Sequence, residues 1–268
     1  MCHCSISYAG ITRGPENRVS RHVFLNELVK VRGQFYRSVQ IKMDWQEARS
    51  LDEYILTPTA KSLAIQVFEG AFSAQGPRAW SVIGPYGTGK SAFSLFLADL
   101  FCRMPATHAA ARELQEHLEG TRKPFLPILI TGQRSPLVRE LLRNLSEDLR
   151  GIAPVVQENI ERLAQQPVVH DQEVTQAFQI ASQAVQEAGF GGMLVIIDEF
   201  GKFLEFAAQH PEVEDLCVLQ HLAEMAERNS PPVVLITVLH TAFSEYLHTL
   251  DKSRQLEWQK VQGRFTNA

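Results

Sequence analysis

The sequence predicts an α/β fold in which helices cover both faces of a parallel sheet. Two observations support this prediction: short apolar runs alternate with stretches of helical periodicity, and no hairpin turn joins two of the runs. A strand that is covered on both faces reads as nearly continuous apolar sequence, as these runs do. The expected strands are Ala79–Ile83, Phe125–Thr131, Leu194–Glu199 and Pro232–Leu239.

The composition is that of a soluble globular protein. With 268 residues, 45% of them hydrophobic and 21% charged, we expect one large domain, alone or with an appendage. The longest apolar run, Val233–Leu239, is too short to span a bilayer, and the N-terminus has no signal pattern, so we expect a cytoplasmic protein. Cys102 and Cys217 lie in expected helices, and Cys2 and Cys4 have no second ligand pair at zinc spacing.

Charge is unevenly distributed along the chain. Residues 1–42 hold seven Lys or Arg against two Asp or Glu, a net of +5, so the total of −4 leaves −9 for the remainder. We therefore divide the chain into a basic N-terminal arm, residues 1–45, and a core, residues 46–268. The arm is either a solvated segment or a nucleic-acid contact, and its sequence indicates one helix around Val23–Val29.

Start signals and apolar faces locate the helices. Thr57 is the expected N-cap of a helix that has Pro58 at its first position. Pro127 lacks a backbone N–H, so we expect the second strand to be irregular there or to start one residue later. One helix is expected to follow Thr57, with the apolar face Leu63, Val67, Phe68 and Phe72. The other expected helices are Ala92–Phe101, Ala109–Leu118, one from Ser135 to near Gly151 (apolar face Leu137, Leu141, Leu142, Leu145), Val155–Ala188 (apolar face Val174, Phe178, Ala181, Val185), Ala242–Leu250 and Ser253–Gln262.

The first strand leads directly into a phosphate-binding motif. Residues 84–91 match G-x-x-x-x-G-K-[ST] at every fixed position, and an apolar strand and a helix flank them. Such a loop turns its backbone N–H groups toward a phosphate, at the positive end of the following helix. Lys90 would reach the β- and γ-phosphate oxygens of ATP, and the Ser91 hydroxyl would bind Mg²⁺. The expected nucleotide-binding residues of the loop are Gly84, Pro85, Tyr86, Gly87, Thr88, Gly89, Lys90 and Ser91.

Polar residues also end two later strands. Asp198 and Glu199 follow an apolar run, and a carboxylate at the end of a strand beside the phosphate loop is placed to serve Mg²⁺, which is the role expected of Asp198. Glu199 is then placed to polarise an attacking water, which favours hydrolysis over transfer to a metabolite. His240 ends the next strand, where it either hydrogen-bonds the γ-phosphate or the water, or is a helix cap or core histidine.

Together these residues resemble the AAA+ ATPases and their STAND and origin-recognition-like relatives. The phosphate loop, Asp198–Glu199, His240 and Gly263–Phe265 are similar to the Walker A, Walker B, sensor 1 and arginine-finger positions of that clade. This resemblance implies a P-loop NTPase core of the ASCE type, with Lys90, Glu199 and Arg264 as catalytic residues. Since the gap from Lys90 to Asp198 is long for such a core, extra helices are expected around the second strand.

A narrower resemblance is to the ATPase module of large bacterial ATP-binding proteins often encoded in phage-defence islands. It rests on Tyr54–Pro58, Gly84–Phe93, Asp198–Glu205 and Trp258–Phe265. The AAA+ pattern continues past the arginine finger into a fifth strand and a helical lid, and we expect this chain to end before both. The resemblance implies a homo-oligomer or a larger polypeptide or complex, with no membrane partner.

Three functions stay open on this sequence. The first is an ATP-hydrolysing motor or switch that uses Lys90, Ser91, Asp198 and Glu199. The second is a non-hydrolysing ATP or ADP sensor that gates a partner domain, and it has the same motifs. The third is a P-loop kinase. Two features of the sequence count against it: the presence of Glu199 and the absence of a recognisable lid over an acceptor.

Overall fold

Five parallel strands form one sheet in the computed structural model of the chain. The structure describes residues 39–47, 51–73, 75–117, 122–213 and 216–268. The expected helix around Val23–Val29, the nucleic-acid alternative for the basic arm, and Cys2 and Cys4 fall outside these residues. The strands are β1 Ala79–Ile83, β2 Phe125–Thr131, β3 Gly192–Asp198, β4 Val233–Leu239 and β5 Thr266–Asn267, in the spatial order β2-β3-β4-β1-β5.

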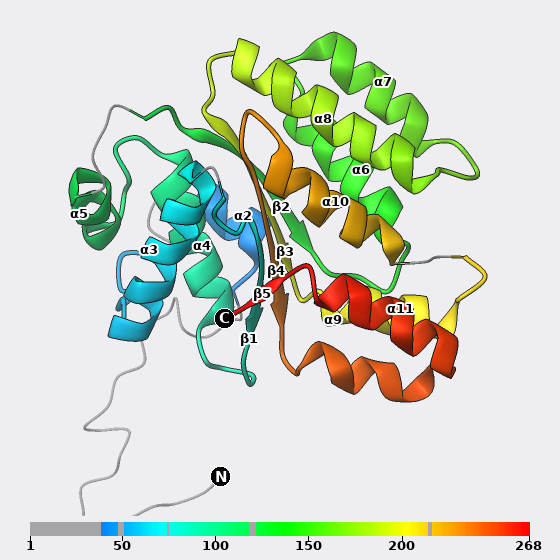
Figure 1. Cartoon of the computed structure of the whole chain (residues 1–268). Coiled ribbons are helices and arrows are strands. Elements are labelled where there is room, and N and C mark those ends of the chain that lie inside the picture. The colour runs from blue at the N-terminus through cyan, green and yellow to red at the C-terminus, as the bar shows by residue number, and fades with distance from the viewer. Residues whose placement is uncertain (1–38, 48–50, 74, 118–121, 214–215) are drawn as a thin grey trace, which may run out of the picture. The chain divides into compact units, whose positions relative to one another are not determined.

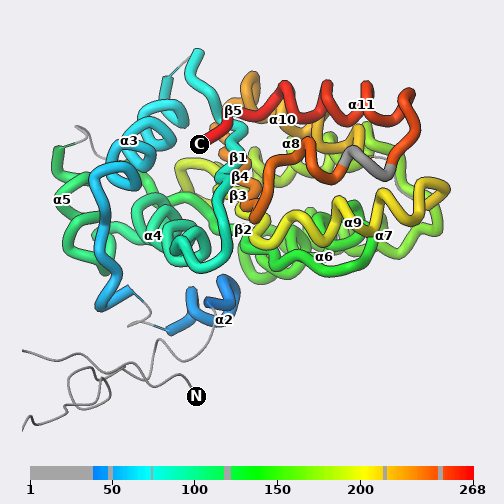
Figure 2. Tube along the Cα trace, turned by 90° about the horizontal axis from the view of Figure 1, so that it is seen from below, coloured from blue at the N-terminus to red at the C-terminus, as the bar shows by residue number. Residues whose placement is uncertain are grey.

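Helices cover both faces of this sheet (Figure 1). One face carries α2 Ile41–Gln46, α3 Pro58–Phe72, α4 Lys90–Cys102 and α5 Ala109–His117. The other carries α6 Leu137–Asp148, α7 Pro154–Ala164, α8 Asp171–Glu187, α9 Gly201–Gln209, α10 Cys217–Arg228, the 3-10 segment η2 Phe243–Thr249 and α11 Lys252–Gln262. Figure 2 shows the two helical layers separated by the strands. The predicted α/β class is thereby confirmed, and no helix among the described residues combines the length and the apolar character needed to cross a membrane.

Alternation along each strand divides the core into two halves. Leu126, Ile128 and Ile130 of β2 pack with the α6–α11 layer, whereas Phe125 and Leu129 pack with the α2–α5 layer. This follows from the period of two in a strand, which sends successive side chains to opposite faces. Since both faces are covered, both sets must be apolar, which is why the strands read as unbroken apolar runs.

Several helix boundaries follow the sequence signals. The Thr57 side chain accepts a hydrogen bond from the Ala60 N–H at 3.3 Å, and Pro58 opens α3. In α6 the predicted apolar face is fully buried. The additional helices expected around the second strand are also present, with α5 before β2 and α6, α7 and α8 after it.

Pro127 does not disturb β2, contrary to the prediction. The strand starts at Phe125 and pairs continuously with β3, with Pro127 opposite Leu194. The prediction was wrong because β2 is an edge strand of the sheet, where a proline can face outward without removing a ladder hydrogen bond. The outer edge is also close to α2, whose Lys42 and Trp45 line a small hollow with Pro127.

Helix α2 contributes to the core, although residues 41–45 were assigned to the N-terminal arm. Ile41 is fully buried and packs in the α2–α5 layer. This helix is short, so its apolar residues show too little periodicity for the sequence to separate the helix from the preceding arm.

The fifth strand begins within the chain, which corrects the expectation that the chain ends before it. Thr266 and Asn267 pair in parallel with Trp80 and Ser81 of β1. The Ala268 N–H donates to the Ser81 carbonyl at 2.9 Å, and the Ile83 N–H donates to the Ala268 carbonyl at 3.0 Å. Two exposed residues carry no alternation pattern, so a strand of this length leaves no sequence signal.

Candidate nucleotide-binding site

The phosphate loop joins β1 to α4 through two glycines in the left-handed region. Gly87 has φ of 78° and Gly89 has φ of 84°, values at which a residue with a Cβ atom is strained. Within the described part of the chain, no protein group accepts a hydrogen bond from the N–H groups of Gly87, Thr88 or Gly89. These donors precede the amino end of a 13-residue helix, so the loop presents unpaired N–H groups and a positive helix terminus together.

Lys90 places a cation inside this loop. Its Nζ donates to the Pro85 carbonyl oxygen at 2.7 Å, and the Thr88 hydroxyl donates to the same oxygen at 2.9 Å. The residue is buried, and burial lowers the pKa of the Lys90 ammonium, an effect that the nearby Asp198 opposes. A partly desolvated ammonium beside free N–H groups is suited to an anion with several oxygens, such as a polyphosphate.

Asp198 ends β3 and reaches the first turn of α4. It is 2% exposed, and burial raises the pKa of its carboxyl group, while hydrogen bonds from the Ser91 hydroxyl and the Glu199 N–H oppose the rise. A hydroxyl and a carboxylate in contact are hard oxygen donors, and they fit Mg²⁺, which takes few protein ligands beside phosphate and water. No cluster of three or more His, Cys, Asp or Glu that could hold a metal occurs in the described residues.

Glu199 has an unusual backbone conformation. Its φ of 51° is the one positive value among the non-glycine residues that the structure describes. Its N–H donates to Asp198 Oδ1 at 2.9 Å, and the next N–H, that of Phe200, donates to the Val238 carbonyl at 3.0 Å. Because such conformations persist only where the surroundings impose them, the turn after β3 is held in one shape, and the Glu199 side chain in that turn is 35% exposed.

Two neighbours of Glu199 were not anticipated by the sequence. Lys202, in the first turn of α9, forms an ion pair with the Glu199 carboxylate. Gly132, which follows β2, donates its N–H to the Asp198 carbonyl at 2.7 Å, and a Cβ atom there would lie 2.0 Å from the Glu199 carbonyl oxygen. A glycine directly after a strand was the available signal for this close approach.

His240 follows β4 and lies against the phosphate loop. Its ring stacks on that of Tyr86, with centroids 3.7 Å apart and planes at 19°. Burial lowers the pKa of His240, Lys90 and Lys202 act in the same direction, and Glu199 and Asp198 oppose them. Because His240 interacts with all four of these charged groups, it lies in the same site.

The strand order explains how these residues meet. The sequence placed a carboxylate at the end of a strand beside the phosphate loop, and in the sheet β4 lies between β1 and that strand, β3. All three strands run in the same direction, so their carboxyl ends share one edge of the sheet, and Gly84, His240 and Asp198 follow one another along it. The Gly84 N–H donates to the Leu239 carbonyl at 3.2 Å, which fixes the loop to the end of β4.

Arg264 lies apart from this site. It follows α11 and precedes β5, whose residue Thr266 is level with Trp80 near the amino end of β1. Its Nη2 is 2.8 Å from Glu224 Oε1 of α10. Within this chain, therefore, Arg264 is an ion-pair partner of α10 toward the amino end of β1, whereas the phosphate loop follows the carboxyl end of that strand.

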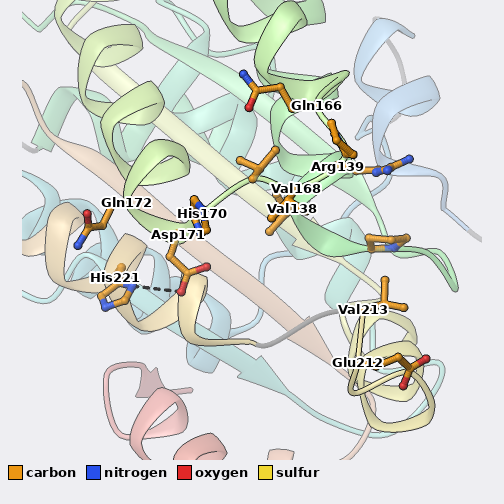
Figure 3. A pocket seen from close by; sticks show the side chains of 13 residues that line it. Val138, Arg139, Gln166, Val168, His170, Asp171, Gln172, Glu212, Val213 and His221 are labelled. Atoms are coloured by element: carbon orange, nitrogen blue, oxygen red, sulfur yellow. Dashed lines mark ion pairs between the residues drawn. The ribbon is translucent and has the colours of Figure 1, made fainter.

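A hollow of about 740 Å³ lies elsewhere, between the starts of α6, α8 and α10 (Figure 3). Val138, Val168 and Val213 line it, together with an ion pair in which His221 Nδ1 is 3.4 Å from Asp171 Oδ2. None of the residues of the phosphate loop, nor Asp198, Glu199 or His240, contributes to its wall. Its volume is that of a ligand pocket, but the groups suited to phosphate are at the loop.

Comparisons with known proteins give little detail. No model of a known protein family matches the chain, and no curated protein matches it. Among solved structures, the chain is similar to one described as the Aeropyrum pernix ORC2 protein in ADPNP–ADP complexes, at 14% identity and a TM-score of 0.46. The match covers 82% of this chain and 50% of that one, so the chain spans about half of its length. The fold assignment therefore rests on the parallel sheet, its strand order and its two helical layers.

Proposed function

We propose that the chain binds ATP with Mg²⁺ at the loop of residues 84–91, and that the protein is an AAA+-like ATPase. The observation that supports this most directly is the convergence of Lys90, Ser91 and Asp198 beside two left-handed glycines and their free N–H groups. In this proposal the loop N–H groups and Lys90 hold the phosphates. Ser91 and Asp198 would hold Mg²⁺, which when bound neutralises phosphate charge.

Hydrolysis requires a group that acts on water, and we assign this role to Glu199. Its carboxylate is half-exposed at the same sheet edge, one residue after Asp198. We place the protein in the cytoplasm, as an oligomer or part of a larger assembly, and we retain the resemblance to phage-defence ATPases as a proposal about its setting.

The ion pair of Glu199 with Lys202 favours the alternative, a sensor that binds ATP or ADP without hydrolysing it. In this pair the Glu199 carboxylate already contacts an ammonium, so one of its oxygens is engaged before any water reaches it. The kinase alternative would be excluded by release of inorganic phosphate in the absence of any acceptor.

Calorimetric titration of the protein with ATP, ADP and AMP tests nucleotide binding. We expect saturable binding of ATP and ADP, strengthened by Mg²⁺ for ATP, and little binding of AMP, because the loop binds the β-phosphate that AMP lacks. Titration in excess EDTA is the matched control for the metal. Binding of AMP as tight as that of ADP would place the recognition outside the loop and overturn the assignment.

Arg264 is proposed to act on the site of a neighbouring subunit. Such a guanidinium stabilises charge on the transferred phosphoryl group, an effect of order 10³ to 10⁵ in rate in GTPases. In the protein at its full natural length, Arg264→Ala should bind ATP normally, hydrolyse it poorly, and regain turnover when mixed with Lys90→Ala, which supplies an intact arginine. Glu224→Gln is the matched control, since it removes the ion pair of 2.8 Å but keeps the arginine, and we expect it to hydrolyse ATP. Unchanged turnover in Arg264→Ala would leave the residue as a partner of Glu224 only.

A further inference from the structure

Lys202 has two carboxylates close to it along the chain. Glu199 comes three residues before it, directly after β3, and Glu205 comes three residues after it on α9. Side chains three positions apart are neighbours on a helix surface, so Glu205 is an alternative partner for the Lys202 ammonium. The structure shows the ammonium paired with Glu199. The contact that Glu205 makes instead explains this choice.

Glu205 is held by an arginine from another segment. Arg134 lies in the loop between β2 and α6, and its Nε and Nη2 donate to Glu205 Oε2 at 3.1 and 3.0 Å. Both hydrogen bonds join charged groups, which makes each of them stronger than a bond between neutral groups. The guanidinium therefore balances the charge of Glu205 and leaves the Lys202 ammonium to Glu199.

Both ion pairs lie at the surface. In the first pair the exposed fractions of the side chains are 72% for Arg134 and 39% for Glu205. In the second pair they are 46% for Lys202 and 35% for Glu199. Ion pairs at this exposure are weak, and the formed state outweighs the open state by a factor of about 1.5 to 5. An exchange of partners between the two pairs therefore requires no change of fold and shifts populations by a similarly small factor.

We propose that Arg134 is a positioning residue for Glu199, which it reaches through Glu205 and Lys202. While Arg134 holds Glu205, the Lys202 ammonium stays on the carboxylate that would act on water. When Glu205 is released, it competes with Glu199 for the ammonium, and the Glu199 carboxylate is unpaired for a larger fraction of the time. The loop after β2 thus sets how much of the protein is ready to hydrolyse ATP. This inference rests on the proposed function and adds to it a control of the same site.

Phosphate release by the protein at its full natural length tests the effect on turnover. Arg134→Gln should raise turnover about 1.5- to 5-fold, no further than Lys202→Gln does, and leave the affinity for ATP unchanged. Arg134→Lys keeps the charge and should be closer to the parent. Glu205→Gln breaks the same ion pair but offers Lys202 no second carboxylate, so it should not be faster than the parent, and it should cancel the gain of Arg134→Gln in the double variant. Equal changes in Arg134→Gln and Glu205→Gln would mean that the pair only supports the fold, and they would overturn the inference, as would an unchanged or lower rate in Arg134→Gln.

Carbon-13 NMR of the glutamate Cδ groups, at one pH and without nucleotide, tests the exchange of partners independently of turnover. Loss of a signal in Glu199→Gln identifies the Glu199 carboxylate, and the parent and Lys202→Gln give its positions with and without the ammonium. Arg134→Gln should move the signal toward its position in Lys202→Gln, whereas Glu205→Gln should leave it near that of the parent. A signal that does not move in Arg134→Gln would overturn the inference, even in a protein that does not hydrolyse ATP. If the signal moved but neither the parent nor Lys202→Gln released phosphate, hydrolysis would fail as the proposed function and the exchange of partners would stand.

Discussion

Replacement of Lys90 by alanine is expected to weaken ATP binding about 10- to 100-fold, the range for loss of hydrogen bonds between charged groups. The effect is large because the ammonium is buried and already lies inside the loop, 2.7 Å from the Pro85 carbonyl oxygen. An ordered cation needs little rearrangement to meet a phosphate, so its full attraction contributes to binding. Competition between ATP and a fluorescent ATP analogue gives the two dissociation constants.

Lys252→Ala is the matched control for the loss of one positive charge. Lys252 is an exposed residue at the start of α11, and its removal should leave ATP binding unchanged. Thermal unfolding of both variants without nucleotide establishes that each is folded. If Lys90→Ala bound ATP as tightly as the parent protein, the loop would not be the phosphate site, whatever its sequence.

Much of the site could be predicted because it depends on local sequence and on one rule of parallel sheets. The motif of residues 84–91 specifies its own backbone, since Gly87 and Gly89 adopt the left-handed conformations that glycine allows. Asp198 and His240 then meet this loop because the carboxyl ends of parallel strands share an edge. Neither step requires knowledge of the strand order, in which β4 lies between β1 and β3.

What could not be predicted depends on contacts between distant segments. The Arg264–Glu224 ion pair joins residues 40 positions apart, and the stack of Tyr86 on His240 joins residues from different strand ends. The position of Pro127 is acceptable only because β2 is at the edge of the sheet, which is a property of the whole topology. Similarly, Gly132 is required by the approach of the Glu199 carbonyl, and the sequence around Gly132 contains no trace of that partner.

Replacement of Glu199 by glutamine should abolish most ATP hydrolysis while keeping ATP binding. The amide has the shape of the carboxylate but does not accept a proton, and loss of a general base lowers turnover by about 10² to 10⁴. The backbone at Glu199 should tolerate the change, because main-chain hydrogen bonds of Gly132 and Phe200 hold the residues on either side of it. Release of inorganic phosphate by the protein at its full natural length gives the rate, and calorimetry gives the affinity.

The ion pair with Lys202 makes this experiment able to separate a hydrolase from a sensor. In Lys202→Gln the Glu199 carboxylate loses its ammonium partner and is free to contact the attacking water, so a hydrolase should turn over ATP a few times faster than the parent. The double variant with Glu199→Gln should then be as slow as Glu199→Gln alone, since the gain acts through that carboxylate. Equal turnover in the parent and in Glu199→Gln would move the catalytic role to another residue. A protein that binds ATP tightly, but releases no phosphate either as the parent or as Lys202→Gln, would instead be a nucleotide sensor.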